Sequence, residues 1–156
     1  MISLLSKDIR LEQVMPLIRE RLAEGKKVIF GPKGTSMLPM LRQGIDRVEL
    51  VAVKGKLKKY DLPFYVRDNG QYVLHRIVKV RDTYTCIGDN QYVYEHGVRQ
   101  DQIIAVMTGY YRGDEYISAK SWRYRWYCRR WHWTRPIRPF WRRLKGKLVR
   151  LIRGKK

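Results

Sequence analysis

LPFYVRDNGQYVLHRIVKV, at residues 62–80, is the stretch of the sequence that decides the fold. Two largely apolar runs flank Asp68-Asn69-Gly70, and Asn-Gly is among the strongest short-range hairpin signals because both residues tolerate a positive φ. We therefore predict a β-hairpin, with one strand over residues 62–67 and a second over residues 71–80. His75 falls inside the second predicted strand.

Further short strands are predicted on both sides of this hairpin. Strand-like runs at residues 27–30, 47–53, 83–87 and 102–107 are separated by segments rich in Gly, Pro, Asn or Asp. Apolar residues at helical spacing over residues 11–22 predict one preceding helix, with Pro16 weakening its first turns and Gly25 ending it. This pattern indicates a mainly β protein with a coiled antiparallel sheet or partial barrel.

The charge of the chain is very uneven. Residues 1–119 hold 19 basic and 14 acidic side chains, whereas residues 120–156 hold 15 basic and no acidic ones. We divide the chain into an N-terminal helix packing on the body (residues 1–26), a β domain (27–112) and a basic, Trp-rich tail (113–156). The polycation is therefore the tail alone.

The turn-forming segment Gly34-Thr35-Ser36-Met37-Leu38-Pro39-Met40 carries a candidate nucleophile. A serine on a turn and a histidine on a nearby strand, as in Ser36 and His75, are the minimum parts of a base-activated nucleophile. Each residue is a weak signal alone, and Asp89 in a Gly-Asp-Asn sequence is usually a turn aspartate that bonds its own backbone. Their joint occurrence in this order, around a β scaffold, favours a catalytic site.

Three motifs resemble those of one peptidase clan. Residues 34–39 resemble the Ser-Met-x-Pro nucleophile motif of type I signal peptidases, and self-cleaving SOS repressors use a matching serine. Residues 73–78 resemble the His-Arg motif that carries the base in signal peptidases of the endoplasmic-reticulum type, where most bacterial relatives place a lysine. Residues 88–90 are similar to the Gly-Asp-Asn motif that contributes an acidic residue. The sequence particularly resembles the short signal-peptidase-like proteins that some bacteria have.

The resemblance implies a serine endopeptidase with Ser36 as nucleophile, His75 as general base and Asp89 as the acid that orients the ring. In the endoplasmic-reticulum type a second acidic residue follows, in a register that falls on Glu95, so Asp89, Glu95 or both are candidates. The backbone N–H of Ser36, with Thr35 as a candidate side-chain donor, would stabilise the oxyanion. The implied substrate is an extended peptide bound along a strand edge, with small side chains before the cut.

A histidine base suits this chemistry near neutral pH. The pKa of a lysine must be lowered from about 10.4 by burial before the amine can accept a proton, whereas histidine starts near about 6.5. The imidazole needs only orientation, which a carboxylate supplies by accepting a hydrogen bond from the ring and stabilising the imidazolium that forms.

The composition also bears on metals, disulfides and location. Cys86 and Cys128 are too few and too far apart for a disulfide framework or a zinc site, so we read both as free thiols and expect neither metal nor cofactor. No apolar run approaches the about 20 residues that span a bilayer. The first residues are too short for a signal-peptide core. We expect a cytoplasmic protein that associates peripherally with a membrane.

The tail predicts a basic amphipathic helix after Pro136 and Pro139. We expect it to bind an anionic membrane surface, because tryptophans suit the headgroup interface and each basic residue near anionic lipid contributes about 1 kcal/mol. Nucleic acid, another protein, or the body of this chain are the alternative partners. The residues expected to bind the membrane are Trp126, Trp131, Trp133, Phe140, Trp141, Leu144 and Leu148.

The leading hypothesis is thus a Ser-His(-Asp) endopeptidase acting at a membrane surface. The alternative is a non-catalytic β module that binds a membrane or a partner through its tail. A self-cleaving DNA-binding repressor is a third and weaker hypothesis, because only one helix precedes Val28 and a helix-turn-helix needs more.

Overall fold

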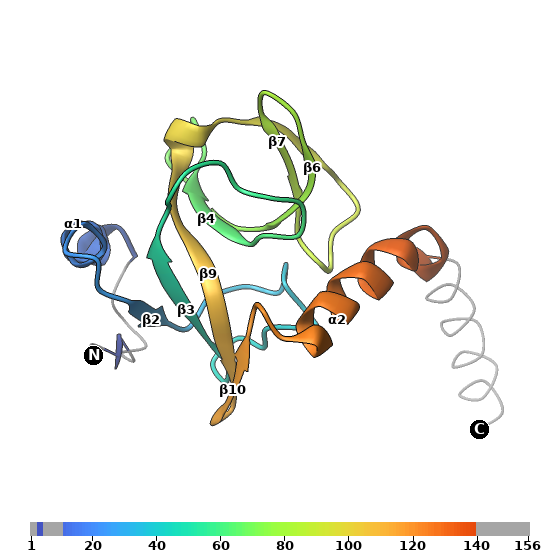
Figure 1. The fold of residues 1–156 in the computed structure, drawn as a ribbon, viewed down its shortest axis with the longest axis horizontal. Helices are drawn as coiled ribbons and strands as arrows, with labels where there is room; N and C mark the ends of the chain where they lie inside the picture. The colour runs from blue at the N-terminus through green and yellow to red at the C-terminus, as the bar shows by residue number, and fades with distance from the viewer. Residues whose placement is uncertain (1–2, 5–10, 140–156) are drawn as a thin grey trace, which may run out of the picture.

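The computed structural model describes residues 3–4 and 11–139. Its strands curl into an antiparallel half-barrel with a helix near each end of the described chain (Figure 1), so the expectation of a mainly β protein is confirmed. The helices are α1, Leu11–Ala23, and α2, Trp122–Trp133. Two short 3₁₀ turns are η1, Gln100–Gln102, and η2, Arg135–Ile137.

The strands form two sheets. The larger sheet has the order β1-β2-β3-β9-β4-β5, with β10 pairing with β9, and only its β1–β2 pair is parallel among the described strands. The smaller antiparallel sheet has the order β6-β7-β8. The bounds are β1 Ser3–Leu4, β2 Val28–Phe30, β3 Arg47–Ala52, β4 Pro63–Val66, β5 Tyr72–Leu74, β6 Arg76–Val80, β7 Tyr84–Ile87, β8 Glu95–Val98, β9 Ile103–Arg112 and β10 Glu115–Ser118.

The predicted hairpin is confirmed as β4 and β5, which pair in antiparallel register. Across the turn, the Arg67 N–H donates to the Gln71 carbonyl at 2.9 Å. Gly70 adopts a φ of +82°, the left-handed conformation that the Asn-Gly signal predicts.

The single second strand predicted over residues 71–80 is wrong, because the chain changes sheets at His75. β5 ends at Leu74 in the larger sheet, and β6 begins at Arg76 in the smaller one. Hydrogen bonds with Tyr60 and Asp61 hold Ile77 of β6 in its new place. His75 therefore lies where the chain passes between the two sheets.

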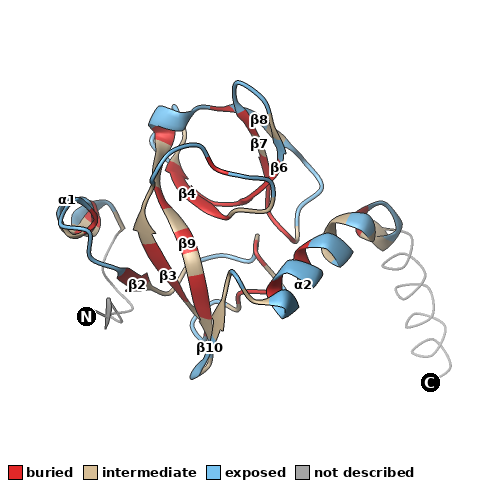
Figure 2. Cartoon of the chain, in the orientation of Figure 1, coloured by how far each residue is buried: buried red, intermediate tan, exposed pale blue. Residues whose placement is uncertain are grey.

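The hydrophobic core has two parts. Apolar side chains of α1, among them Met15, Ile18 and Leu22, pack with β3, β4 and the segment after β2. A second cluster, which includes Tyr65 and Ile77, lies between β4 and the smaller sheet. Figure 2 shows buried residues along β3, β4 and β9. The first cluster also contains Met37, Met40 and Leu41, so it anchors the segment that carries Ser36.

Helix α2 was not predicted, although its local signals are clear in hindsight. Ser121 caps it by accepting a hydrogen bond from the Tyr124 N–H at 3.3 Å, and Tyr124 and Cys128 are buried at helical spacing. The amphipathic helix predicted after Pro139, with Phe140, Trp141, Leu144 and Leu148, lies outside the described residues. No helix in the described part of the chain is long and apolar enough to cross a membrane.

Candidate active site

Ser36 lies on the segment between β2 and β3. Its neighbour Met37, together with Met40 and Leu41, is buried in the α1 cluster. These buried side chains hold the segment to the core. Ser36 itself is half-buried, between exposed Thr35 and buried Met37. Its backbone is therefore held by the core, while the residue remains partly accessible to solvent.

The loop of residues 88–91 holds the Ser36 backbone from the other side. The Asn90 N–H donates to the Ser36 carbonyl at 2.8 Å, and the Asn90 side-chain amide donates to the Thr35 carbonyl at 3.2 Å. A Cβ atom at Gly88 would lie 2.7 Å from the Ser36 carbonyl oxygen, which is closer than real Cβ atoms approach. The Gly-Asp-Asn motif thus needs glycine at position 88 for close approach to Ser36.

His75 is buried, with only 4% of its surface exposed. Its Nδ1 atom lies 3.5 Å from the Tyr65 hydroxyl and 3.6 Å from Glu95 Oε2. Burial lowers the pKa of His75 to about 4, and the Glu95 carboxylate only partly offsets this. The ring is therefore neutral near pH 7 and can accept a proton.

Glu95, at the start of β8, is the carboxylate beside the His75 ring. Its oxygens accept hydrogen bonds from the Tyr65 hydroxyl at 2.7 Å and from the Arg67 guanidinium at 2.8 Å twice. Partial burial alone would raise the pKa of Glu95, but these hydrogen bonds and the Arg67 charge hold it below its ordinary value. Glu95 thus stays ionised and faces Nδ1 at a distance just beyond a hydrogen bond, as is common in unliganded sites.

Asp89 has a different set of contacts. Its carboxylate accepts two hydrogen bonds from Arg76, at 2.9 and 2.8 Å, and a third from the Tyr127 hydroxyl at 3.0 Å. Its side chain is fully buried. Both carboxylate oxygens of Asp89 therefore already accept hydrogen bonds. In the described part of the chain, no hydrogen bond joins Asp89 to His75. Of the two carboxylates left open by the sequence, the one placed against the imidazole is Glu95.

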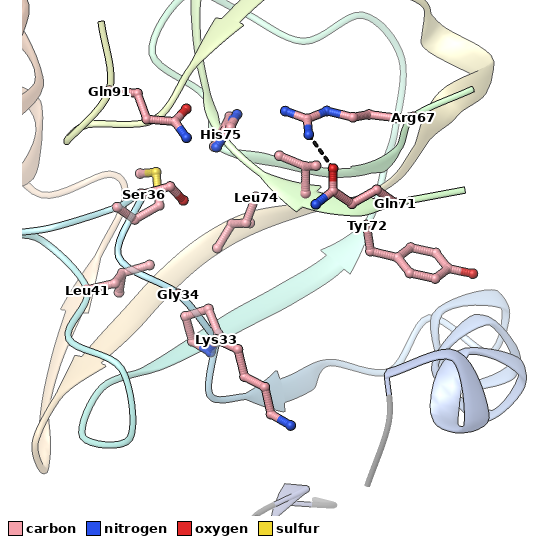
Figure 3. A pocket seen from close by; sticks show the side chains of 13 residues that line it. Lys33, Gly34, Ser36, Leu41, Arg67, Gln71, Tyr72, Leu74, His75 and Gln91 are labelled. Carbon is pink, nitrogen blue, oxygen red and sulfur yellow. Dashed lines mark hydrogen bonds between the residues drawn. The ribbon is translucent and has the colours of Figure 1, made fainter. Parts of the chain in front are cut away.

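Ser36 and His75 line one pocket of about 210 Å³. Figure 3 shows the His75 ring between the Ser36 and Arg67 side chains, with Gln91 nearby. The wall opposite Ser36 is formed by β5 and by Gln71, whose side chain accepts a hydrogen bond from Arg67. Thr35 is exposed and does not line this pocket. The pocket is therefore lined by Ser36, the His75 ring and β5.

The described residues hold no group of three or more His, Cys, Asp or Glu side chains that could bind a metal ion. Both cysteines are buried free thiols, as expected from their number and spacing. Burial raises the pKa of Cys86 to about 12, so this thiol is protonated near neutral pH and is a poor nucleophile.

The tail residues assigned to membrane binding do not share one environment. Trp126 and Trp133 are exposed, whereas Trp131 turns toward the body, where its indole N–H donates to the Asp89 carbonyl at 2.8 Å. Trp131 also stacks on Tyr127 with ring centroids 5.6 Å apart. Its ring therefore packs inward, away from the outer face of α2. Trp122 is also exposed, although it is not among the residues predicted to bind the membrane.

Sequence reasoning also missed the residues that hold the two carboxylates. Tyr65 and Arg67 fix Glu95 from β4 and the turn after it, and Arg76 fixes Asp89. Arg76 follows His75 in the His-Arg motif, which was the one available signal for it. The others contact partners far along the chain, where local patterns give no information.

In comparisons with protein-family models, curated proteins and solved structures, nothing matches this chain. The resemblance to signal peptidases therefore rests on the motifs around Ser36, His75 and Asp89.

Proposed function

We propose that this protein is a serine endopeptidase in which Ser36 is the nucleophile and His75 the general base. One observation carries the proposal: Ser36 shares a pocket with a buried, neutral His75 that lies against the Glu95 carboxylate. A hydroxyl, a base and a group that orients the base are the parts that nucleophilic catalysis by serine needs. Of the two carboxylates that the motifs suggest, Asp89 and Glu95, we assign the role of orienting His75 to Glu95.

The roles of the atoms follow from the ring's orientation. Because Nδ1 faces Glu95 and Tyr65, Nε2 is the atom left to accept the Ser36 proton. Ser36 Oγ bonds to the carbonyl carbon, and the peptide C–N bond breaks as His75 returns the proton to the amine. Water then attacks the acyl-enzyme and gives its proton to Nε2. The bond between Ser36 Oγ and the acyl carbon breaks as His75 returns that proton to Oγ, which releases the acid and restores the serine. The negative Glu95 stabilises the imidazolium at both stages.

The proposed substrate is an extended peptide that adds to the edge of β5. In the described sheet β5 pairs only with β4, so its other edge has free backbone groups beside the pocket. Residues 72–74 line one side of the pocket, and Gly34 and Ser36 line the other. Small side chains next to the scissile bond are what the resemblance to signal peptidases implies.

The site is proposed to act at an anionic membrane surface. Trp122, Trp126 and Trp133 are 75%, 57% and 73% exposed, and their spacing puts them on one face of α2. Arginines flank this face, with Arg130 stacked on the Trp126 ring at 5.0 Å. Exposed tryptophans among arginines suit a headgroup region. Trp126→Ala combined with Trp133→Ala should reduce co-sedimentation with anionic vesicles, while neutral vesicles bind neither form.

Labelling with a fluorophosphonate serine probe tests the peptidase directly. Wild type should be labelled at Ser36, whereas Ser36→Ala should not be labelled. His75→Ala should be labelled at a rate lower than that of wild type by a factor of about 10² or more. Peptide mapping of the labelled protein identifies the modified residue. Equal labelling of all three proteins would end the proposal.

A non-catalytic module that binds membranes is the second candidate, supported by the exposed tryptophan face of α2. It predicts that Ser36→Ala preserves the cellular function, whereas Trp126→Ala with Trp133→Ala removes it. The peptidase predicts that Ser36→Ala removes the function even when vesicle binding is intact.

A further inference from the structure

The inner side of the tail places hydrogen-bond donors on the loop of residues 88–91. The Trp131 indole N–H and the Arg138 guanidinium donate to the Asp89 carbonyl, at 2.8 and 2.9 Å. Arg135 is buried and donates to the carbonyls of Gly88 and Gln91, at 3.2 and 2.7 Å. The carbonyls of Gly88, Asp89 and Gln91 are thus paired by α2 and by the residues directly after it.

The same loop is the one that fixes Ser36. Its Asn90 N–H bonds the Ser36 carbonyl, and its Gly88 packs against that carbonyl without room for a Cβ atom. The chain of contacts therefore runs from α2 to the loop and from the loop to the backbone of the proposed nucleophile. A change in the first set of contacts moves the second.

A buried charge network links the same helix to the strand that follows the proposed base. Arg76 is 1% exposed and donates to Tyr124 Oη at 2.7 Å and to Cys128 Sγ at 2.9 Å, both on α2. Arg76 also donates twice to the Asp89 carboxylate, which accepts a further hydrogen bond from Tyr127 of α2. Helix α2 thus contacts the residue next to His75 as well as the loop next to Ser36.

We propose that α2 and the turn after it form a brace for the active site, with Tyr127, Trp131 and Arg135 as positioning residues for Ser36. This inference rests on the proposed peptidase function and assigns the tail a role beyond the membrane. None of the three residues lines the pocket or touches the reacting atoms. They act by holding the loop of residues 88–91 in place, and a small displacement of a nucleophile costs a large factor in rate.

The matched pair Tyr127→Phe and Tyr116→Phe tests the brace. Each change removes one phenol O–H that donates to a carboxylate, Asp89 at 3.0 Å in the first case and Glu49 at 2.9 Å in the second. Tyr127→Phe should lower kcat and the rate of fluorophosphonate labelling about tenfold with little change in KM. Tyr116→Phe should keep wild-type kinetics. Trp131→Phe, which keeps a ring and removes the indole N–H, should match Tyr127→Phe.

Hydrogen exchange separates the brace from the chemistry. The Asn90 amide should exchange faster in Tyr127→Phe and Trp131→Phe than in wild type, while amides in the centre of β9 keep their rates. Unchanged Asn90 exchange with wild-type labelling in both variants would overturn the brace. If wild type is not labelled at Ser36, the peptidase proposal fails, and Asn90 exchange alone then decides whether α2 holds the loop. Thermal melting checks that each variant is folded.

Discussion

Asp89 and Glu95 lie close together in the sequence, and each is paired with an arginine, yet the two regions do different work. Asp89 is fully buried and bonds Arg76 and the α2 residue Tyr127. Glu95 is 23% exposed at its side chain, bonds Arg67 and faces His75. The same functional group thus serves a structural network in one place and faces the proposed base in the other.

The difference teaches that an acidic motif residue cannot be assigned a role from charge alone. Glu95 has an oxygen within 3.6 Å of the imidazole and a hydroxyl, Tyr65, that contacts both groups. The oxygens of Asp89 are occupied by donors that come from β6 and α2. What each carboxylate can do is decided by which arginine reaches it.

The largest effect is expected on stability when Asp89 loses its charge. Asp89→Asn leaves the Arg76 guanidinium buried without a counter-ion, which should lower the free energy of unfolding by about 3–5 kcal/mol. Urea denaturation measures the change. Asp68→Asn, which breaks an exposed pair with Arg99, should cause no measurable loss. Similar losses in the two variants would contradict the structural role of Asp89.

A large effect on rate is expected at the other carboxylate. Glu95→Gln keeps an acceptor oxygen but removes the charge that stabilises the imidazolium, so kcat should fall about 10²-fold. Steady-state turnover of a peptide substrate provides the measurement, with exposed Glu115→Gln as the unaffected control. Full activity in Glu95→Gln, together with its loss in folded Asp89→Asn, would return the orienting role to Asp89.

The lowered pKa of His75 predicts a dependence of stability on pH. The unfolded chain binds a proton at this ring near about pH 6.5, whereas the folded protein resists it until about pH 4. Stability from the neutral buried ring is therefore complete above about 6.5 and is lost as the pH falls toward 4, by roughly 3 kcal/mol.

Urea denaturation between pH 7 and pH 4 measures this loss, and an NMR titration of the ring gives the folded pKa. His75→Phe should lose less stability over the same range, because its ring does not titrate. The dependence of stability on pH that remains in this variant comes from the carboxylates, among them Glu95. Burial alone would raise the pKa of Glu95, but hydrogen bonds from Arg67 and Tyr65 lower it. If the free energy of unfolding fell equally with pH in wild type and His75→Phe, the pKa of His75 would not be lowered by folding.

The smallest of these effects is expected at Tyr65. Tyr65→Phe removes the hydroxyl that donates to Glu95 and contacts His75, so kcat should fall about fivefold, the value of one hydrogen bond of about 1 kcal/mol. Tyr84→Phe is the matched control, because Tyr84 is equally buried and its hydroxyl bonds Leu57 and Gln100 away from the site. Equal kinetic losses in both variants would show a general packing effect.

Local signals predicted the parts of this molecule that local chemistry decides. The Asn69-Gly70 turn marked the hairpin, and the apolar runs on both sides of it marked its strands. The division of residues 71–80 between two sheets was not visible, because these residues form one continuous, largely apolar run with no turn signal inside it. Only the partners of β5 and β6 distinguish them, and those partners lie elsewhere in the chain.

The candidate site was predictable as a set of residues but not as an arrangement. Ser36, His75 and Glu95 were all named from the motifs, whereas the choice of Glu95 over Asp89 depends on Tyr65, Arg67 and Arg76. The role of α2 was hidden for the same reason. Its inner side chains contact residues about 40 positions or more away, such as Trp131 with Asp89.

A practical consequence follows for truncation. Deleting residues 120–156 removes both the tryptophan face and the contacts of Tyr127 and Trp131 with the loop of residues 88–91, so it cannot distinguish an enzyme from a binding module. A deletion that begins at residue 140 keeps α2 and all its described contacts. It also keeps the tryptophan face, so the double change Trp126→Ala with Trp133→Ala, which leaves the loop contacts in place, is the variant that separates a loss of surface binding from a loss of chemistry.

Helix α2 carries the tryptophan face on one side and the loop contacts on the other, and thermodynamic linkage makes these two sides reciprocal. A vesicle that binds the docked helix more tightly than a detached one must stabilise the arrangement that holds Ser36. By the same factor, a bound inhibitor that needs this arrangement must tighten binding to the vesicle. Vesicle affinity measured with and without a covalent serine inhibitor gives that coupling factor directly.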